Sequence, residues 1–407
     1  MMRKSGIVSI IVIGVVIFGG VFWYRYWPGL RPAFGPAPVD ITTLIPDTLA
    51  EDAHEHIAET DTLGAEEAAT AAEQQNPLKL PKGYRISIFA RGLGKPRVIA
   101  WDPAGTLLVS IPSAGKIVAL PDENKDGTSD RVVTVVEELD RPHGIAFDEQ
   151  LLSIAESGAV AQYEYSSKTF RASTRMPMVN LPAGGNHFTR TIQYGRDGML
   201  YVTVGSSCNV CYEQDDRRAA MLRFDPQSRA PKLEPVAWGL RNTVFFAQHP
   251  TTGEWWGNDM GRDFLGDDLP PDELNIIHFG NYGWPRCYGN RIVDPFGGTA
   301  AVCEKTIPAH YQYQAHVAPL GLVFENEKTL YVAYHGSWNR SSPVGYKVVK
   351  LTLDDQYRVV NEEDFLTGFL TPRGALGRPV DLSFGPDGAL YISDDKAGVI
   401  YRVTKTK

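Results

Sequence analysis

The chain has 407 residues, of which 43% are hydrophobic and 11% aromatic, so it can bury a large core in one long domain or two ordinary ones. Its formal net charge is -8 at pH 7, and Lys and Arg form no basic stripe. This balance argues against a nucleic-acid partner, which requires clustered positive charge.

The first 27 residues predict a membrane anchor. Arg3 and Lys4 precede an uninterrupted stretch of 18 apolar or small residues, 7–24, which is just long enough to span a bilayer as a helix. The basic residues place the N-terminus in the cytoplasm, and Trp and Tyr residues follow the stretch on its exit side. A cleavable signal peptide is the alternative, although no clear small-x-small site follows. Both interpretations place the rest of the protein on the periplasmic or extracellular side.

Residues 28–78 predict a flexible linker. They begin rich in Pro and continue rich in Ala and acidic residues. Such a composition buries little apolar surface and favours a flexible or weakly helical chain. We therefore expect this segment to hold the following domain away from the membrane.

Residues 79–407 contain six copies of one pattern, strand–turn–strand–loop–strand, with alternating apolar residues in each strand. Asp, Pro and Gly mark the turns, because Pro presets φ and Gly accepts positive φ. Strands repeated at this spacing are typical of an all-β fold, the six-bladed β-propeller. Two separate β-sandwiches would not explain six copies. The copies start at Pro96, Pro142, Thr189, Asn242, Pro319 and Pro379.

Polar residues recur at or just before the first strand of each copy. Because this is one structural position in every blade, we expect the residues to form a ring around one end of the central channel. The members are Arg97, His143, His187 with Arg190, Arg241 with Asn242, His316, and Arg378.

The ring predicts both acid–base chemistry and an anionic ligand. His187 follows two glycines that allow close approach of a ligand, and a neutral imidazole can take a proton from an alcohol. His143 is the second candidate for this base. Guanidinium groups bind carboxylates in pairs of hydrogen bonds, so several arginines at one mouth indicate a polycarboxylate or phosphate ligand. The arginines concerned are Arg190, Arg241, Arg340 and Arg378.

A calcium loop is predicted in the first copy. Its oxygen ligands alternate along the sequence, with Gly127 at the turning position, but Val133 stands where a calcium loop has its Glu. We therefore expect a weak structural calcium site, and a polar turn is the alternative. The expected ligands are Asp122, Asn124, Asp126 and Asp130.

The four cysteines predict disulfides. An even number in an exported chain favours pairing, and proximity in sequence suggests Cys208–Cys211 and Cys287–Cys303. A redox pair or half of a zinc site at Cys208 and Cys211 remains an alternative. Tyr212 occupies the place that a haem-attachment His would need.

Several stretches together resemble the glucose/sorbosone dehydrogenase family. They are HFTR (187–190), GLRN (239–242), DELNII (272–277), GNYGWP (280–285) and RPVD (378–381). The SCNVC run (207–211) and the HGSWNR run (335–340) are similar to the sorbosone-dehydrogenase-like branch. The resemblance spans roughly residues 79–405 and agrees with a six-bladed propeller.

The resemblance implies a cofactor, pyrroloquinoline quinone (PQQ), lying over the channel with Ca²⁺ at its quinone carbonyl. It implies that His187 takes the sugar hydroxyl proton while hydride passes to PQQ. Arg241, Asn242 and Arg378 would contact the cofactor.

It further implies that the backbone carbonyls of Gly261 and Arg262 bind the calcium. Two positions depart from the family pattern, because Arg262 replaces a proline and Val380 replaces an arginine.

The sequence therefore predicts a membrane-anchored PQQ-dependent sugar dehydrogenase, oxidising an aldose or a sorbosone-like sugar. No haem motif is present, so a separate quinone or cytochrome would accept the electrons. Two alternatives remain, since a fold does not determine a function. One is a calcium-dependent lactonase-type hydrolase, and the other is a non-catalytic propeller that binds the cell envelope.

Overall fold

The computed structural model describes residues 29–45 and 76–406. The expected anchor (1–27) lies outside these residues, as does most of the expected linker (28–78). No helix within the described residues is long and apolar enough to cross a membrane.

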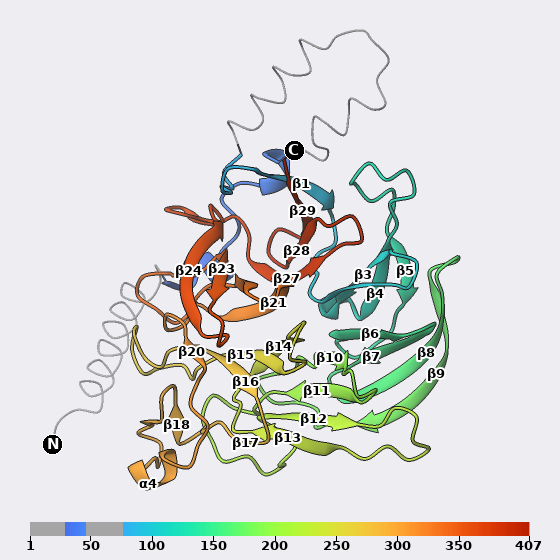
Figure 1. Cartoon of the computed structure of the whole chain (residues 1–407). Coiled ribbons are helices and arrows are strands. Elements are labelled where there is room, and N and C mark those ends of the chain that lie inside the picture. The colour runs from blue at the N-terminus through green and yellow to red at the C-terminus, as the bar shows by residue number, and fades with distance from the viewer. Residues whose placement is uncertain (1–28, 46–75, 407) are drawn as a thin grey trace, which may run out of the picture.

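Six β-sheets follow one another around a ring, and we number them as blades 1 to 6 in chain order (Figure 1). Blade 1 consists of β2 (Ile99–Trp101), β3 (Leu107–Ile111), β4 (Lys116–Leu120) and β5 (Val133–Val136). Blade 2 consists of β6 (Gly144–Asp148), β7 (Leu151–Ala155), β8 (Ala159–Ser166) and β9 (Arg171–Asn180). Blade 3 consists of β10 (Ile192–Tyr194), β11 (Leu200–Val204), β12 (Ala220–Phe224), β13 (Glu234–Trp238) and β17 (Gly280–Asn281).

Blades 4 to 6 complete the ring. Blade 4 consists of β14 (Thr243–Gln248), β15 (Trp255–Asp259), β16 (Glu273–Ile277) and β20 (Tyr311–Gln312). Blade 5 consists of β21 (Pro319–Asn326), β22 (Thr329–Tyr334), β23 (Lys347–Leu353) and β24 (Val359–Leu366). Blade 6 consists of β27 (Pro379–Phe384), β28 (Leu390–Asp394), β29 (Val399–Lys405) and β1 (Tyr84–Ala90). The six-bladed propeller predicted from the repeats is confirmed.

The turns form as their sequences predict. In blade 1 the carboxylate of Asp102 accepts hydrogen bonds from the backbone N–H groups of Ala104 and Thr106, and Gly105 has a φ of 86°. These contacts end β2 and direct the chain back into β3. The first two strands of each blade are antiparallel, which places the start of the first strand and the end of the second at the same end of the channel.

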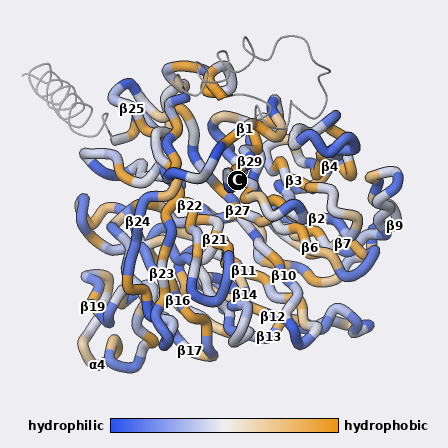
Figure 2. The backbone as a smooth tube through the Cα atoms, turned by 45° about the horizontal axis from the view of Figure 1, so that its top comes forward, coloured by the Kyte–Doolittle hydropathy of each residue, from blue (hydrophilic) through white to orange (hydrophobic). Residues whose placement is uncertain are grey.

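Hydrophobic residues concentrate in the inner strands of each blade (Figure 2). In blade 5, five of the six residues of β22 are buried, whereas the outermost strand β24 is mostly exposed and hydrophilic. The largest fully buried side chain is Trp256 in blade 4. The core therefore lies between the faces of neighbouring blades and leaves the connecting loops free to carry polar groups.

The ring is closed by the two ends of the propeller sequence. Strand β1 pairs antiparallel with β29, so blade 6 combines the first and last strands of the domain. Sequence analysis did not identify this closing strand. It removes the free edge that blade 6 would otherwise expose.

The described part of the expected linker packs on the propeller. Ile41 and Ile45 are buried in a cluster with side chains of blades 5 and 6, and Lys396 Nζ donates a hydrogen bond of 2.6 Å to the carbonyl of Gly35. The 3-10 helix η1 (Ile41–Thr43) lies in this stretch. Residues 29–45 therefore differ from the flexible chain that their composition predicts.

The segment between β16 and β21 is the largest insertion. It contributes β17 and β20 to blades 3 and 4, and it holds β18 (Cys287–Tyr288), β19 (Ile292–Val293) and α4 (Ala300–Cys303). The disulfide Cys287–Cys303 closes it, and a second disulfide joins Cys208 to Cys211. Both predicted pairings are confirmed.

The pairing of β1 with β29, which closes the ring of blades, leads to a prediction about stability. Replacing Ile88 with Ala should lower the free energy of unfolding by about 2–5 kcal/mol, because it leaves a cavity where β1 packs against the last blade. Ile88 is 1% exposed and lies opposite Tyr401 of β29. Val360→Ala is the matched control, since Val360 is 61% exposed on an outermost strand. Urea denaturation of both variants measures the difference, and equal stabilities would contradict the closing role of β1.

Candidate functional site

The predicted ring residues precede corresponding strands, and five of them lie close to polar partners from neighbouring blades. They are Arg97, His187, Arg241, Asn242 and Arg378. They precede the first strands of the blades, and their neighbours at the ends of the second strands include Ser206, His335 and Asp395. Their charges act on one another from blade to blade, because Arg241 disfavours protonation of His187 and Arg97 lies near enough to Arg378 to lower its pKa. The prediction of a shared polar mouth is therefore supported by the geometry of the blades.

His187 is held in one tautomer. Its Nδ1 lies 2.9 Å from the carbonyl oxygen of Ser206 and 3.0 Å from the Ser206 hydroxyl oxygen. That hydroxyl donates its own hydrogen to the carbonyl of Cys208 at 2.7 Å, so it can only accept from the imidazole. Nδ1 therefore carries the proton. Nε2 keeps its lone pair and has no hydrogen bond to any described residue.

The surroundings keep this imidazole neutral. Burial, reinforced by the guanidinium groups of Arg241, Arg190 and Arg218, lowers the pKa of His187 to about 3, against the opposing effect of the Ser206 carbonyl. Between the ordinary pKa of 6.5 and the lowered value, the unfolded chain binds a proton that the folded chain does not. The contribution of His187 to stability is therefore lost as the pH falls through that window.

Arg241 joins the loops of blades 3 and 4. Its Nε and Nη2 donate to the carbonyl and side-chain oxygens of Asn209, at 3.0 and 2.8 Å. Its Nη1 donates to the carbonyls of Met260 and Gly261, and Nη2 also pairs with Asp263 at 3.2 Å. The guanidinium is thus fully engaged within the protein, which differs from the free cation that sequence analysis expected.

The carboxylate of Asp259 fixes the turn that carries Arg241 and Asn242. It accepts hydrogen bonds from both backbone N–H groups, at 3.0 and 2.8 Å, and from the hydroxyl of Thr243. Burial raises the pKa of Asp259 to about 6, and these hydrogen bonds oppose the rise.

Asn242 presents an unsatisfied acceptor beside His187. Its Oδ1 is buried and has no partner among the described residues. A Cβ on Gly205 would lie 2.5 Å from this oxygen and 2.7 Å from the Cβ of His187. Gly205 is therefore required for the close approach of these two side chains, and the open amide oxygen indicates a place for a hydrogen-bond donor.

A second polar group comes from blades 5, 6 and 1. Asp395 accepts from Nε2 of His335 and from Nη1 of Arg97, each at 2.8 Å. Arg378 donates to the carbonyls of His335 and Gly336. Although burial opposes it, the neighbouring His335, Arg97 and Arg378 hold the pKa of Asp395 below its ordinary value. This side of the mouth therefore carries more positive than negative groups.

Other predicted site residues support loops of the propeller through hydrogen bonds to backbone carbonyls. Arg190 is fully buried and donates to the carbonyls of Pro182, His187 and Thr189. It holds the loop of His187 and does not face the mouth as a cofactor-binding group.

Arg340 is similar, because it is buried and donates to the carbonyls of Asp267, Ala315 and Ser342. His316 also bonds carbonyls, those of Gly266 and Leu269, through its Nε2.

His143, the second candidate base, is fully buried. Its ring packs against Phe188 and Phe245, and its Nε2 has no partner among the described residues. Burial, together with Arg97 and Arg190, holds its pKa well below the ordinary value. A fully enclosed ring suits proton exchange with a ligand less well than His187.

Two backbone positions were expected to bind calcium. The carbonyl of Gly261 accepts a hydrogen bond from Arg241 at 2.8 Å, and its N–H donates to Asp272 at 2.8 Å. The side chain of Arg262 instead pairs with the buried Asp294 at 2.9 Å and lies toward the 287–303 insertion.

In the predicted calcium loop, the carboxylates accept hydrogen bonds from backbone N–H groups of the same loop. Asp122 accepts from the N–H groups of Asp126 and Gly127, and Asp130 accepts from the N–H of Glu123. Within residues 29–45 and 76–406, the only group of three or more His, Cys, Asp and Glu side chains close enough to share a metal is Cys208, Cys211 and Glu213. The calcium role of the loop stays a prediction.

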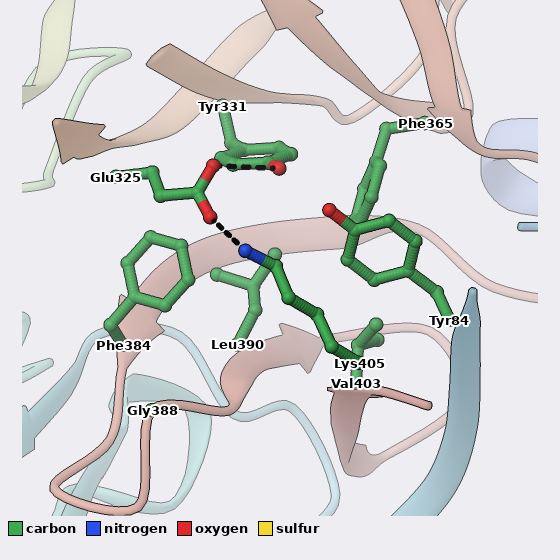
Figure 3. A pocket seen from close by; sticks show the side chains of 9 residues that line it. All are labelled: Tyr84, Glu325, Tyr331, Phe365, Phe384, Gly388, Leu390, Val403 and Lys405. Carbon is green, nitrogen blue, oxygen red and sulfur yellow. Dashed lines mark hydrogen bonds and ion pairs between the residues drawn. The ribbon is translucent and has the colours of Figure 1, made fainter. Parts of the chain in front are cut away.

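A separate pocket lies between blades 5 and 6, away from the mouth (Figure 3). Tyr84, Tyr331 and aromatic neighbours surround it, and Lys405 pairs with Glu325 across it at 2.7 Å. The ion pair satisfies both charges, and none of the predicted site residues lines the pocket. The mouth is therefore the better candidate for a site.

Sequence analysis missed two residues of the mouth. Asn209 contacts both Arg241 and Asp263, but an Asn inside a C-x-x-C run carries no signal for that role. Asp395 could have been found, because it follows the second strand of blade 6 just as His335 follows the second strand of blade 5.

Comparison with known proteins agrees with the fold. The sequence profile described as TrAA12-like matches residues 78–406. An uncharacterized protein of Borreliella burgdorferi is 33% identical over 359 residues, covering 82% of this chain and 92% of that protein. A pyrroloquinoline quinone-dependent pyranose dehydrogenase of Coprinopsis cinerea is 28% identical over 415 residues, covering 82% of this chain. The match spans 56% of the length of the fungal protein.

Among solved structures, the calcium structure of a Trichoderma reesei carbohydrate-active enzyme of family AA12 superimposes with a TM-score of 0.73. It is 24% identical in sequence, and the match covers 81% of this chain and 97% of that one.

The bracing of His187 makes a direct prediction. In ¹⁵N-histidine NMR spectra of the protein, His187 should remain neutral from pH 8 down to about pH 4, with the proton on Nδ1, because burial and Arg241 oppose protonation. His335, whose pKa is lowered by burial and by Arg378 to about 4, should begin to protonate at a higher pH in the same sample and serves as the comparison. Protonation of His187 near pH 6.5 would contradict the assignment.

Proposed function

The chain belongs to the TrAA12-like family, and from this premise we propose that it is a PQQ-dependent sugar dehydrogenase that uses His187 as its general base. The substrate would be an aldose or a sorbosone-like sugar. The observation that carries the proposal is the unprotonated Nε2 of His187 at a mouth lined by Arg97, Arg241 and Arg378.

The residues present fit a flat, anionic cofactor. Arginines from blades 1, 4 and 6 give the mouth positive charge, which favours a tricarboxylate. Asn242 offers an acceptor without a partner. Arg97, Asn242 and Arg378 would hold the group, and Arg241, whose N–H groups already have acceptors in the protein, would add positive charge beside it. The carbonyls of Gly261 and Arg262 remain the proposed calcium ligands. When bound, PQQ supplies a two-electron acceptor for hydride, and Ca²⁺ would polarise its carbonyl.

The chain itself supplies the proton transfer and the positioning. Nε2 of His187 accepts the proton of the sugar hydroxyl as its C–H bond is oxidised. Ser206 keeps the imidazole in the correct tautomer, and Arg190 and Arg218 hold the loop before it through backbone carbonyls. Burial of the mouth loops limits competing water.

A hydrolase is less well supported. A calcium-dependent lactonase requires side-chain carboxylates that converge on the channel. In the part of the chain that the structure describes, the one converging group is Cys208, Cys211 and Glu213, and both cysteines are in a disulfide.

The location and partners follow from the same proposal. Residues 1–27 would anchor the protein, with the propeller on the periplasmic or extracellular side. Electrons would pass to a separate quinone or cytochrome.

Reconstitution tests the function. The purified chain mixed with PQQ and Ca²⁺ should show cofactor absorbance and should oxidise sugars with an artificial electron acceptor. His187→Ala should lower kcat/KM about 100-fold or more while PQQ still binds, because the base acts on the substrate.

His278→Ala is the matched control and should keep full activity, since that ring is exposed and lies on another loop. Failure of the native chain to bind PQQ would overturn the proposal. Full activity of His187→Ala would assign the base to another residue.

The loop at residues 122–130 has its own test. We propose that it holds a structural calcium ion, so Ca²⁺ should raise the melting temperature of the cofactor-free protein. A site filled at 100 times its Kd adds about 2.7 kcal/mol. Asp126→Ala should remove that calcium-dependent rise and leave sugar oxidation intact, as differential scanning calorimetry and activity assays would show. An unchanged rise in Asp126→Ala would place the ion elsewhere.

A further inference from the structure

A short loop closed by a disulfide lies against both key side chains of the mouth. Residues 206–213 form the first part of the connection from β11 to β12, and Cys208 is bonded to Cys211 within it. We refer to residues 206–213 as the disulfide loop. Its position raises the question of what the disulfide does for the site.

The disulfide loop holds the catalytic candidate His187. The Ser206 hydroxyl donates to the carbonyl of Cys208 at 2.7 Å and accepts from Nδ1 of His187. The backbone of Cys208 thereby sets the direction of the Ser206 hydroxyl. Through this hydroxyl, the Cys208 carbonyl reinforces the tautomer of His187 that the Ser206 carbonyl also requires.

The same loop holds Arg241. Asn209, one of the two residues between the cysteines, accepts from Nε of Arg241 through its carbonyl and from Nη2 through its side chain. The side-chain oxygen of Asn209 also accepts the N–H of Asp263 at 2.8 Å, and its Nδ2 donates to the carbonyl of Asp263 at 3.2 Å. Asn209 therefore holds the guanidinium of Arg241 and the backbone of Asp263, the carboxylate partner of Arg241, in place.

The two disulfides differ in access. Cys208 and Cys211 are partly exposed, whereas Cys287 and Cys303 are 3% and 1% exposed. Reduction proceeds by attack of a thiolate on an accessible sulfur, so a thiol reductant reaches the disulfide loop first. Cross-links restrict the conformations of the loop they close, and their removal restores that freedom.

We propose that the Cys208–Cys211 disulfide is a redox-sensitive lock on the mouth, in which Asn209 is the positioning residue for Arg241 and Cys208 positions Ser206 and His187. A dithiol reductant breaks the S–S bond and becomes a cyclic disulfide, while its two electrons and two protons leave Cys208 and Cys211 as thiols. The freed loop then no longer holds Asn209 against the guanidinium.

The charges around His187 make this lock measurable. Arg241 faces the imidazole together with Arg190 and Arg218. Arg190 and Arg218 are held by the carbonyls of the 182–189 loop and do not contact the disulfide loop. Reduction should therefore move Arg241 alone, and His187 should become easier to protonate.

The experiment is a histidine titration of the cofactor-free chain before and after mild reduction with dithiothreitol. Alkylation and mass spectrometry confirm that Cys208 and Cys211 are reduced while Cys287 and Cys303 stay paired. The pKa of His187 should rise by about one pH unit, because a neighbouring positive charge that disfavours protonation moves away. A shift of that size corresponds to about 1.4 kcal/mol of electrostatic interaction. An unchanged His187 after verified selective reduction would overturn the proposal.

Variants separate the lock from a general loss of structure. Cys208→Ser/Cys211→Ser and Asn209→Ala should each raise the pKa of His187 in the oxidised protein, whereas Val210→Ala in the same loop should leave it unchanged. If reduction also opens the second disulfide, the double cysteine variant decides, since it keeps Cys287–Cys303. If the pKa of His187 in both the double variant and Asn209→Ala equals that in the oxidised native protein, the proposed lock is rejected.

The effect on catalysis rests on the proposed function and is read separately. PQQ titration by absorbance should show about tenfold weaker binding after selective reduction, because Arg241 no longer faces the cofactor. If PQQ does not bind the oxidised protein, the proposed function fails, and the histidine titration still tests the lock.

Discussion

The mouth of this propeller depends on the hydrogen bonding of one buried guanidinium group, that of Arg241. An unpaired buried charge costs several kcal/mol, so each arginine that leaves water must find acceptors. Arg241 finds them on Asn209, Met260, Gly261 and Asp263. Those acceptors lie on separate loops of blades 3 and 4, which one side chain therefore fixes relative to each other. Arg241 therefore connects two loops through hydrogen bonds, and its positive charge also acts on the site.

This dual use explains what sequence could and could not predict. Alternating apolar residues and Asp, Pro and Gly turns recur in register, so the six blades and the ring positions followed from the pattern. The direction of a long side chain does not follow from a pattern, because Arg190 and Arg241 occupy equivalent places and differ in their acceptors. The closing strand β1 was missed for a related reason, since its partner β29 is far away in sequence.

The two sides of the mouth carry different groups. Blades 3 and 4 hold His187, Arg241 and the open oxygen of Asn242 within one group of contacts. Blades 5, 6 and 1 hold Asp395 between Arg97 and His335, with Arg378 beside them. Positive charge on both sides and a neutral base on one of them are what an anionic ligand and a neutral sugar would each require.

The low pKa of His187 appears at first to contradict its role as a base. An imidazole that protonates only near pH 3 has little affinity for a proton, so it is a weak base in the protein without cofactor. Burial is the largest cause of that weakness, and the positive charges of Arg241, Arg190 and Arg218 add to it. In the proposed function, a bound tricarboxylate would offset the part that is due to these charges, and the pKa of His187 would rise. Arg241 would then both attract the cofactor and weaken the base until the cofactor is bound, which would couple proton transfer to an occupied site.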